Sequence, residues 1–421
     1  MSLDIVPLRR VFRVVNGGTP TADEGNWGGG IAWATPVDLN AADGVIERTQ
    51  RTLTPLGVRT GSSIVRRDSI LISTRAPIGY VARTAEPMAF NQGCRALVPW
   101  RSVDVRFFVY QLSAITQELQ SRGLGSTFQE LSGGALAEIP VHVPPAEEQR
   151  RIADFLDAET SRIDDMSALQ RTTLNLLAER RRAVLAHLVT GADEVNRGPS
   201  RLAWTDSLPV RWDSVGLSLV AKMGSGHTPS RSRADWWFDC DIPWITTGEV
   251  AQIRDDRRET IYETREKISK LGLANSAAEL HPAGTVVLSR TASAGFSAVM
   301  GYDMATSQDY ATWTCGPRLD PYYLLWCLRA MRADLLGRLA MGSTHKTIYF
   351  PDLQGLRIPL PPMPEQLAIV EAIRDSNAKI DELHDRINRQ LGLLAERRQA
   401  LITAAVTGQL DVTTARSGVG A

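Results

Sequence analysis

The stretch that decides the fold begins at Pro144 and ends at Gly191, and it reads PPAEEQRRIADFLDAETSRIDDMSALQRTTLNLLAERRRAVLAHLVTG. After the two prolines it contains no glycine or proline until its last residue, and it is rich in leucine, alanine, glutamate and arginine, which favour helices. Its apolar residues recur in one seven-residue register, at Leu156, Ile163, Leu177 and Val184, with Gln170 as the polar member. The spacing predicts one long helix that packs along a partner helix.

The same stretch occurs a second time. Residues 125–191 align with residues 342–408 at a constant offset of 217, without a gap, and 22 of the 67 positions are identical. Composition alone would give about one identity in fifteen. The chain therefore contains a duplication, and its matched segments are Gly125-Ser126-Thr127 with Gly342-Ser343-Thr344, Pro144-Pro145-x-x-Glu148-Gln149 with Pro361-Pro362-x-x-Glu365-Gln366, and Leu176–Arg181 with Leu393–Arg398.

The second copy has the more regular heptads. Each helix ends at a glycine, Gly191 or Gly408, as expected for a helix C-terminus. At 1.5 Å per residue, a helix of about 45 residues would span roughly 65 Å. A helical hairpin inside a larger core remains the alternative to a coiled coil. The apolar positions of the second copy are Ile373, Ile380, Ile387, Leu394 and Leu401.

Upstream of the helices the two copies match less closely, and the offset drifts from 209 to 216. A drifting offset indicates loops of different length on a shared scaffold, so the duplicated module is about 210 residues long, far longer than a solenoid repeat. The matched pairs are Thr19-Pro20 with Thr228-Pro229, Ile31-x-Trp33 with Ile242-x-Trp244, Ser73–Gly79 with Ser289–Gly295, and Asn91-Gln92 with Ser307-Gln308.

The globular parts are expected to be mixed α/β domains. Strands are predicted at Ser69–Ser73 and Thr285–Ser289, and helices at Val105–Arg122 and Pro321–Leu339. The predicted fold class is α+β: a pseudo-two-fold tandem duplication in which two similar domains are joined by two long antiparallel coiled-coil helices. The expected boundaries are a first domain at 1–145, a helix and linker at 146–195 (the linker at Asp193–Ser207), a second domain at 196–360, a second helix at 361–412 and a flexible tail at 413–421.

The amino-acid composition excludes few classes of function. The 421 residues carry 47 basic and 47 acidic side chains, so net charge gives no support for nucleic-acid binding. Only five basic residues are lysine, which fits phosphate or guanine recognition but also a high-GC genome. The four cysteines are scattered without CxxC spacing, which predicts a reduced, cytoplasmic protein. No apolar run approaches the roughly 20 residues of a membrane span.

Two similar domains on paired helices would suit a DNA site made of two separated half-sites. B-DNA presents the same face about every 10 base pairs, so a rigid spacer would enforce the gap. Arg suits guanine, Gln suits adenine, and hydroxyl groups suit phosphates. Thr-Pro pairs also shape turns, and Ser-Thr pairs also cap helices, so each candidate has a structural alternative. The candidate DNA-binding residues are Thr19, Arg75, Gln92, Ser126, Thr127, Thr228, Arg290, Gln308, Ser343, Thr344 and Lys346.

The duplicated module, the Pro-Pro-x-x-Glu-Gln motif and the Leu-Leu-Ala-Glu-Arg-Arg motif together resemble the specificity subunit of Type I restriction-modification systems. The segments Leu71–Gly79 and Leu288–Gly295 also resemble that family's target-recognition domains. The resemblance covers essentially the whole chain. It implies that the two globular domains are target-recognition domains, that each reads one half of an asymmetric bipartite site in double-stranded DNA, and that the helices form the spacer.

The resemblance also implies the partners. Two modification subunits would bring S-adenosylmethionine and methylate adenine, and restriction subunits would translocate and cleave DNA with ATP and Mg. No cofactor is expected in this chain. Partner docking is expected on the outward faces of the helices, with a solvated helix face as the alternative for the arginines there. The candidate partner-binding residues are Arg180, Arg181, Arg397 and Arg398.

The sequence predicts no catalysis and no metal site in the chain itself. Gly342–Thr347 is not a phosphate-binding loop, and neither Pro-Pro pair follows the Asn/Asp residue of an adenine methyltransferase motif. None of the five lysines has an acidic residue two positions before it, as a common nuclease motif requires. The six histidines show no metal-ligand spacing.

Two departures from symmetry stand out. Arg75 and Arg290 are one position out of register when the loop glycines of the two copies are aligned. The residues aligned with Phe128-Gln129 in the second copy are His345-Lys346. Two alternative functions stay open at this point: a specificity subunit whose partner is a fused nuclease-methyltransferase, and a coiled-coil scaffold that binds only proteins.

Overall fold

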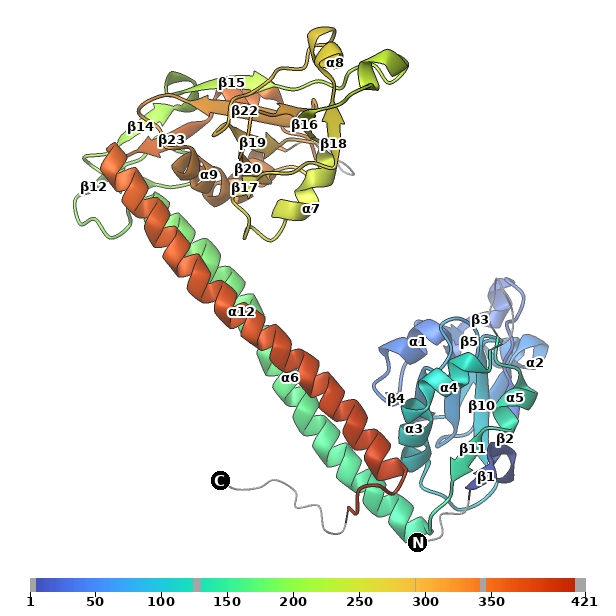
Figure 1. Cartoon of the computed structure of the whole chain (residues 1–421). Coiled ribbons are helices and arrows are strands. Elements are labelled where there is room, and N and C mark those ends of the chain that lie inside the picture. Colours follow the sequence, from blue (N-terminus) through green and yellow to red (C-terminus); the bar gives the residue numbers. More distant parts are fainter. Residues whose placement is uncertain (1–4, 124–129, 292, 341–345, 413–421) are drawn as a thin grey trace. The chain divides into compact units, whose positions relative to one another are not determined.

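A computed structural model describes residues 5–123, 130–291, 293–340 and 346–412. The chain divides into two compact units (Figure 1). Unit 1 comprises residues 1–170 and 389–421, and unit 2 comprises residues 171–388. Two helices of 44 residues each, α6 (Ala146–Val189) and α12 (Met363–Val406), contribute to both units. The tail at 413–421 lies outside the described residues.

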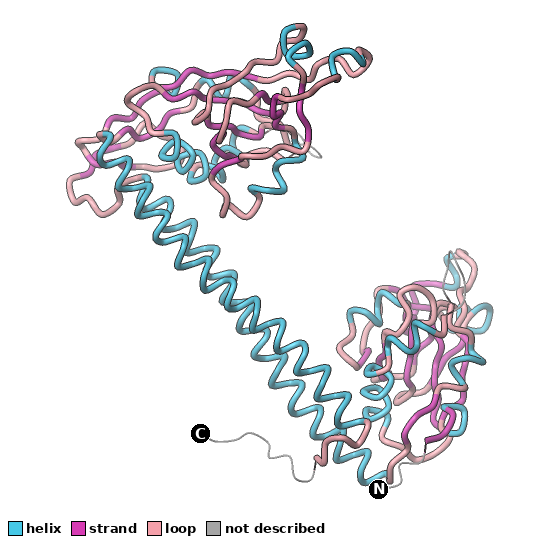
Figure 2. The backbone as a smooth tube through the Cα atoms, in the orientation of Figure 1, coloured by secondary structure: helices cyan, strands magenta, loops and turns pink. Residues whose placement is uncertain are grey.

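The described residues in the globular part of unit 1 form three sheets. A five-stranded sheet has the order β2-β10-β7-β8-β4, a four-stranded sheet has the order β5-β3-β9-β6, and β1 pairs with β11. The elements, coloured by type in Figure 2, are β1 (Ile5–Pro7), η1 (Leu8–Arg10), β2 (Phe12–Asn16), η2 (Glu24–Asn26), β3 (Trp27–Ala34), α1 (Pro36–Ala41), β4 (Val45–Ile46), β5 (Arg51–Leu53), α2 (Pro55–Gly61), β6 (Ser63–Val65), β7 (Ile70–Ser73), β8 (Val81–Thr84), β9 (Met88–Phe90), β10 (Cys94–Pro99), α3 (Val105–Ala114), α4 (Thr116–Ser121), α5 (Gly133–Ala137) and β11 (Pro140–His142).

The globular part of unit 2 repeats this plan. Its five-stranded sheet has the order β15-β22-β19-β20-β17, a three-stranded sheet has the order β18-β16-β21, and β14 pairs with β23. The elements are β12 (Arg197–Pro199), β13 (Ser207–Pro209), β14 (Asp213–Gly216), η3 (Leu217–Leu219), β15 (Ala221–Ser225), η4 (Ala234–Trp237), β16 (Ile242–Ile245), η5 (Thr247–Glu249), α7 (Val250–Ile253), β17 (Thr260–Ile261), β18 (Glu266–Ile268), α8 (Lys270–Ala274), β19 (Val286–Ser289), β20 (Ser297–Met300), β21 (Ala305–Thr306), β22 (Tyr310–Cys315), α9 (Pro321–Ala330), α10 (Arg332–Asp334), η6 (Leu335–Leu339), α11 (Phe350–Gln354) and β23 (Arg357–Leu360).

The central strands β7 and β19 consist of apolar residues followed by one serine, and they lie inside the domains. In β7 and β19 every residue is buried, and β10 and β22 pair with them in antiparallel register. Helices α3 and α9 cover these sheets with buried aromatic and aliphatic side chains. The strands predicted at Ser69–Ser73 and Thr285–Ser289 are thus confirmed to within one residue, and so is the mixed α/β character of both domains.

The long helices pack against each other within each unit. In unit 1, Leu156 near the start of α6 shares a core with Ile402 near the end of α12. In unit 2, Val189 at the end of α6 shares a core with Ile373 near the start of α12. The two segments therefore run antiparallel in each unit, as predicted. The heptad positions Leu156, Ile163, Leu177, Ile373, Ile380 and Ile387 are buried.

Both long helices stop in the same way. Gly191 and Gly408 have φ values of 58° and 74°, the left-handed conformation that glycine adopts without strain. The amide of Gly191 bonds to the carbonyl of Leu188 at 3.2 Å, and that of Gly408 bonds to the carbonyl of Ala405 at 3.3 Å. The predicted glycine stops are confirmed.

The helices predicted as continuous at Val105–Arg122 and Pro321–Leu339 are broken in the structure. The first breaks at Ile115, between α3 and α4, and the second at Met331, between α9 and α10. The break turns the following segment onto the glycine loop after the central strand. There Gln120 donates to the carbonyl of Ile78 at 3.1 Å, and Arg332 donates to the carbonyl of Gly295 at 2.7 Å. Helix propensity carries no information about this tertiary contact.

The segment predicted as a linker is structured. It contains the hairpin of β12 and β13, and Leu202, Leu208 and Trp212 form a small apolar cluster there. Trp212 also donates to a carboxylate oxygen of Glu365 at 3.0 Å, near the start of α12. The linker is therefore packed onto unit 2.

Candidate nucleic-acid interface

A threonine and a glutamine form the same hydrogen bond in both domains. In the first domain, the hydroxyl of Thr19 donates to Oε1 of Gln92. In the second, the hydroxyl of Thr228 donates to Oε1 of Gln308 at 2.7 Å. Both glutamine side chains are exposed. The structure thus brings together four residues chosen from sequence, in two equivalent pairs, each presenting an oriented amide at the surface.

The loops that carry these threonines are held against the sheet by their backbones. The amide of Gly18 bonds to the carbonyl of Phe90 at 3.0 Å, and that of His227 bonds to the carbonyl of Thr306 at 3.0 Å. A Cβ atom at the preceding Gly17 or Gly226 would lie only 2.0 Å from a carbonyl oxygen of the neighbouring segment. Only glycine allows this approach, which explains the Gly-rich segments before Thr-Pro.

Two of the arginines predicted to bind DNA form contacts within the protein. Arg75 forms an ion pair with Glu130 at 3.1 Å, although its side chain stays 48% exposed. Arg290 donates to the backbone carbonyl of Gln308 at 3.0 Å and lies over the ring of Phe350. Burial lowers the pKa of the Arg290 guanidinium. Arg290 therefore holds the backbone of Gln308 in place.

The two arginines are not structural equivalents. The amide of Arg290 bonds to the carbonyl of Asp309, whereas the matching bond in the first domain runs from the amide of Thr74 to the carbonyl of Gly93. Arg290 thus occupies the position of Thr74. The register difference noted in the sequence is real.

Of the remaining DNA-binding candidates, the structure describes only Lys346. Lys346 is exposed, and its ammonium donates to the carbonyl of Leu336 at 3.4 Å. Ser126, Thr127, Ser343 and Thr344 lie outside the described residues.

A tryptophan pair with an arginine over it lies beside each Thr-Pro loop, and the sequence interpretation did not assign it a function. In the first domain, Trp27 and Trp33 meet edge to face, and Arg51 lies 3.6 Å from the centroid of the Trp27 ring. In the second, Trp237 and Trp244 meet in the same way beneath Arg231. The matched Ile-x-Trp segments were the signal that could have revealed these clusters.

The Pro-Pro-x-x-Glu-Gln motif joins each domain to its helix. Buried Gln149 donates to the carbonyl of Pro144 at 2.7 Å and accepts from the amide of Asp104 at 3.0 Å. Asp104 caps the N-terminus of α3. One buried side chain thus connects the start of α6 to the helix that covers the sheet.

The second copy makes the same connection with one bond more. Gln366 is fully buried and donates to the carbonyls of Pro361 and Arg318, each at 2.9 Å. It accepts from the amide of Asp320, the N-cap residue of α9, at 2.9 Å. The motif is therefore explained by a buried hydrogen-bonded junction.

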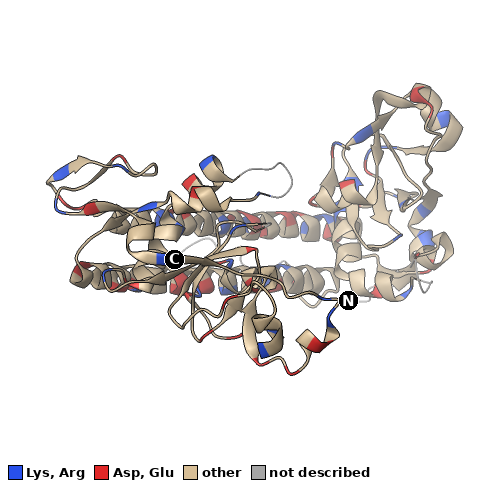
Figure 3. Ribbon diagram, turned by 90° about the horizontal axis from the view of Figure 1, so that it is seen from above, with Lys and Arg blue, Asp and Glu red and all other residues tan. Residues whose placement is uncertain are grey.

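The four arginines proposed for partner docking divide into two kinds. Arg181 forms an ion pair with Asp381, and Arg398 forms one with Asp164 at 3.4 Å, so both bridge the two helices within their units. This placement corrects the expectation that all four face outward. Arg180 and Arg397 are exposed. Figure 3 shows acidic and basic residues interspersed along the helices.

A cavity in unit 2 lies where its globular part meets the helices. It has a volume of about 1030 Å³ and is lined by α6, α12, the helix α9 and the loop at residues 254–257. Arg329 lines it, and its guanidinium donates to the carbonyls of Asp256, Arg258 and Ser297. Burial lowers the pKa of Arg329 to about 10. This arginine holds the loop in place.

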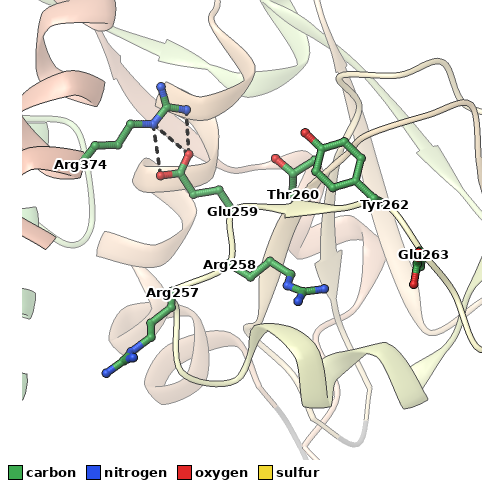
Figure 4. Close-up of a pocket in the computed structure, with 7 residues that line it drawn as sticks. All are labelled: Arg257, Arg258, Glu259, Thr260, Tyr262, Glu263 and Arg374. Atoms are coloured by element: carbon green, nitrogen blue, oxygen red, sulfur yellow. Dashed lines mark hydrogen bonds and ion pairs between the residues drawn. The ribbon is translucent and has the colours of Figure 1, made fainter. Parts of the chain in front are cut away.

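A more open depression of about 690 Å³ lies beside that loop (Figure 4). Arg374 of α12 forms an ion pair with Glu259 at 2.8 Å, and Figure 4 shows Glu263 apart from this pair. The carboxylate of Glu259 is occupied by Arg374, and this ion pair holds the domain against α12. The lining residues of the depression are Arg257, Arg258, Glu259, Thr260, Tyr262, Glu263 and Arg374.

Burial strongly disfavours the thiolate form of three of the four cysteines. All four are free, and burial raises the pKa of the Cys94 and Cys315 thiols to about 12 and that of Cys327 further. Such thiols stay protonated near neutral pH. Within the described ranges, no group of three or more His, Cys, Asp or Glu side chains is arranged to hold a metal ion. None of the described helices has the length and apolarity needed to cross a membrane.

Comparison with known proteins gives a consistent result. The model of the family described as "Type I restriction modification DNA specificity domain" matches residues 3–175 and 209–392. The chain is 23% identical to the Type I restriction enzyme MjaIX specificity subunit of Methanocaldococcus jannaschii, over 97% of this chain and 94% of that protein. It is also 23% identical to the EcoBI specificity subunit of Escherichia coli, over 77% and 70%.

Solved structures share the fold. One, from a study of complex assembly and conformational transition of the type I R-M system, matches 97% of this chain and 100% of its own with a TM-score of 0.72 and 20% identity. The HsdS subunit of Thermoanaerobacter tengcongensis matches 97% of each chain with a TM-score of 0.54 and 19% identity. The predicted fold class, two similar α/β domains in tandem with long helices, is confirmed.

Proposed function

Because the chain belongs to the Type I restriction modification DNA specificity domain family, we propose that it is the DNA-reading subunit of a Type I restriction-modification complex. Each globular domain reads one half of an asymmetric bipartite site in double-stranded DNA. The single observation that carries this is the duplicated Thr–Gln pair, Thr19 with Gln92 and Thr228 with Gln308, on two copies of one scaffold.

The pairs support base reading on chemical grounds. A glutamine amide matches the donor and acceptor of adenine in the major groove, but only when its orientation is fixed. The hydroxyl of each threonine fixes it by donating to Oε1, and Arg290 adds a bond to the backbone of Gln308. The neighbouring side chains differ between the copies, as two different half-sites would require.

The long helices supply the spacer in this proposal. The two segments that pair in each unit are held by equivalent ion pairs, Arg181 with Asp381 and Arg398 with Asp164. Since each helix is 44 residues long, the pair sets the gap between the half-sites geometrically. The proposed domains are 1–145 and 196–360, with spacer helices at 146–195 and 361–412.

Catalysis resides in the partners under this proposal. Two modification subunits supply S-adenosylmethionine and methylate adenine, and restriction subunits use ATP and Mg to translocate and cleave DNA. Exposed Arg180 and Arg397 occupy equivalent positions on α6 and α12, so each is available to one of two identical partners. This chain contributes recognition and assembly, and the proposal places it in the cytoplasm.

The test is to express the chain with the modification subunit of its own system and to map methylated adenines across the host genome. We expect one asymmetric bipartite motif with a fixed gap. A methylated motif without a gap, or the same methylation pattern without this chain, would overturn the proposal.

A second test addresses the spacer. Removing seven residues in register from α6 and from α12 shortens the pair by about 10 Å, or about three base pairs. We expect a shorter gap with unchanged half-sites. A variant that methylates the original motif with the original gap would contradict the spacer role.

A further inference from the structure

The tryptophan cluster of the first domain presents an exposed arginine. The guanidinium carbon of Arg51 lies 3.6 Å from the centroid of the Trp27 ring and 5.5 Å from that of Trp33. The centroids of the two indole rings are 4.9 Å apart, and the ring planes are nearly perpendicular. Stacking on an aromatic face fixes the plane of a guanidinium but leaves its N–H donors at the edge.

The cluster is continuous with the Thr–Gln surface. The indole of Trp33 donates to the carbonyl of Gly18 at 3.1 Å, and that of Trp27 donates to the carbonyl of Thr21 at 2.9 Å. These carbonyls flank Thr19, which bonds to Gln92. Arg51 therefore belongs to the same end of the sheet as the glutamine proposed to read DNA.

The second domain builds the same cluster with the charges arranged differently. Arg231 lies 3.9 Å from the centroid of the Trp237 ring and 5.6 Å from that of Trp244. It also forms an ion pair with Glu266 at 2.5 Å. The guanidinium on this cluster is thus neutralised by a carboxylate.

Strand register identifies which positions correspond. Arg51 of β5 lies opposite Trp33 of β3, and Glu266 of β18 lies opposite Trp244 of β16. The residue of the first domain that corresponds to Arg231, three positions after the loop threonine, is Ala22. One scaffold position therefore carries an arginine in the first domain and a glutamate in the second.

We propose that Arg51 is a specificity-determining residue that reads a guanine in the half-site of the first domain. This rests on the proposed function. A fixed guanidinium fork matches O6 and N7 of guanine in the major groove. Among the residues that the structure describes, Arg51 has no ion pair with a carboxylate, whereas Arg231 has one with Glu266. The proposal therefore assigns no guanine to the corresponding position of the second domain.

The test uses the chain in complex with its modification subunits and a panel of duplexes in which each base pair of the first half-site is changed in turn. The wild-type complex must first discriminate among these duplexes; if it does not, the proposed function fails rather than this inference. For Arg51→Ala, we expect discrimination at one G·C pair to fall by roughly 5- to 150-fold, with discrimination elsewhere retained. Arg51→Lys, which keeps the charge but loses the fork, is expected to lose most of the same discrimination.

Two further variants separate base reading from other roles. Arg59→Ala removes an exposed arginine of the same domain, on α2, and is expected to leave the discrimination at that pair unchanged. The double variant Ala22→Arg/Arg51→Glu transplants the arrangement of the second domain, and it is expected to fold and to lose the guanine preference. Equal weakening of Arg51→Ala on every duplex, or retained preference in the double variant, would overturn the inference.

Discussion

The junction between domain and helix is built twice in this chain, and its two versions differ in an instructive way. The buried part is the same: Gln149 and Gln366 each bond to a proline carbonyl and to the amide of a helix-capping aspartate. The charged contacts differ between the two junctions. In the first, Arg106 of the domain donates to Asp157 of α6. In the second, the arginine is on the helix, and Arg374 of α12 donates to Glu259 of the domain.

The difference follows from solvation. A buried amide that loses its partners costs free energy, so both copies keep it. Half-exposed ion pairs contribute little to the free energy of unfolding, so their residues can change at little cost, and the two copies use different ones. The comparison predicts which substitutions act strongly, and in which unit.

The largest loss of stability is expected from a substitution at Arg329, a position at which the first domain has no arginine. Arg329→Met would leave the carbonyls of Asp256, Arg258 and Ser297 without their donor and cost about 4 kcal/mol of unfolding free energy in unit 2. Denaturant unfolding measures it. Ser113 stands at the corresponding position, and Ser113→Ala is expected to stay within about 0.5 kcal/mol. Equal losses would refute the asymmetry.

The two glutamines come next, and they test whether the junctions are independent. Gln366→Leu is expected to cost about 3 kcal/mol, and Gln149→Leu about 2 kcal/mol, because the second junction has one bond more. Hydrogen exchange of the amides should rise at the start of α9 for the first variant and at the start of α3 for the second. A rise at both sites from one substitution would show that the junctions are coupled.

The helix ion pairs should differ more modestly. Asp381 accepts a hydrogen bond from Arg181 and also forms an ion pair with Arg257 at 3.1 Å, whereas its equivalent Asp164 forms an ion pair with Arg398. Asp381→Ala is therefore expected to cost about 1 kcal/mol, and Asp164→Ala a few tenths. Thermal unfolding at low and high salt checks both, since the loss should shrink as salt screens the pairs. A larger loss for Asp164→Ala would reverse the predicted order.

The smallest effect concerns pH. Burial lowers the pKa of His281 below its ordinary value of 6.5, and Val65 occupies the corresponding position of the first domain. As pH falls below 6.5 the unfolded chain binds a proton that the folded chain resists, so unit 2 loses stability toward acid and is unaffected above that range. His281→Val should flatten this part of the pH profile of unfolding. An unchanged acid slope would rule out His281 as its source.

Part of this architecture is readable from sequence because it rests on periodicity. The heptads of Ile373, Ile380 and Ile387 predict a buried seam, and the glycine stops mark the ends of the helices. The outward or inward direction of neighbouring arginines does not follow in the same way. Arg180 and Arg181 point about 100° apart, and only the register of the two helices decides that Arg181 meets Asp381.

Only some residues of the candidate DNA-binding site could be predicted from the sequence. Thr19, Gln92 and their equivalents stand at matched positions in the two copies, so the repeat revealed them. The correspondence of Arg51 with Glu266 depends on strand register across loops of unequal length, which no constant offset reveals. The contacts of Arg290 likewise depend on tertiary packing against Phe350.

The proposed function depends most on the two domains reading separate half-sites independently. Its most direct test replaces residues 1–145 with the corresponding domain of another family member and maps the methylated motif in cells that contain the modification subunit. One half of the motif is expected to change while the other half and the gap stay the same. A change in both halves, or in neither, would contradict it.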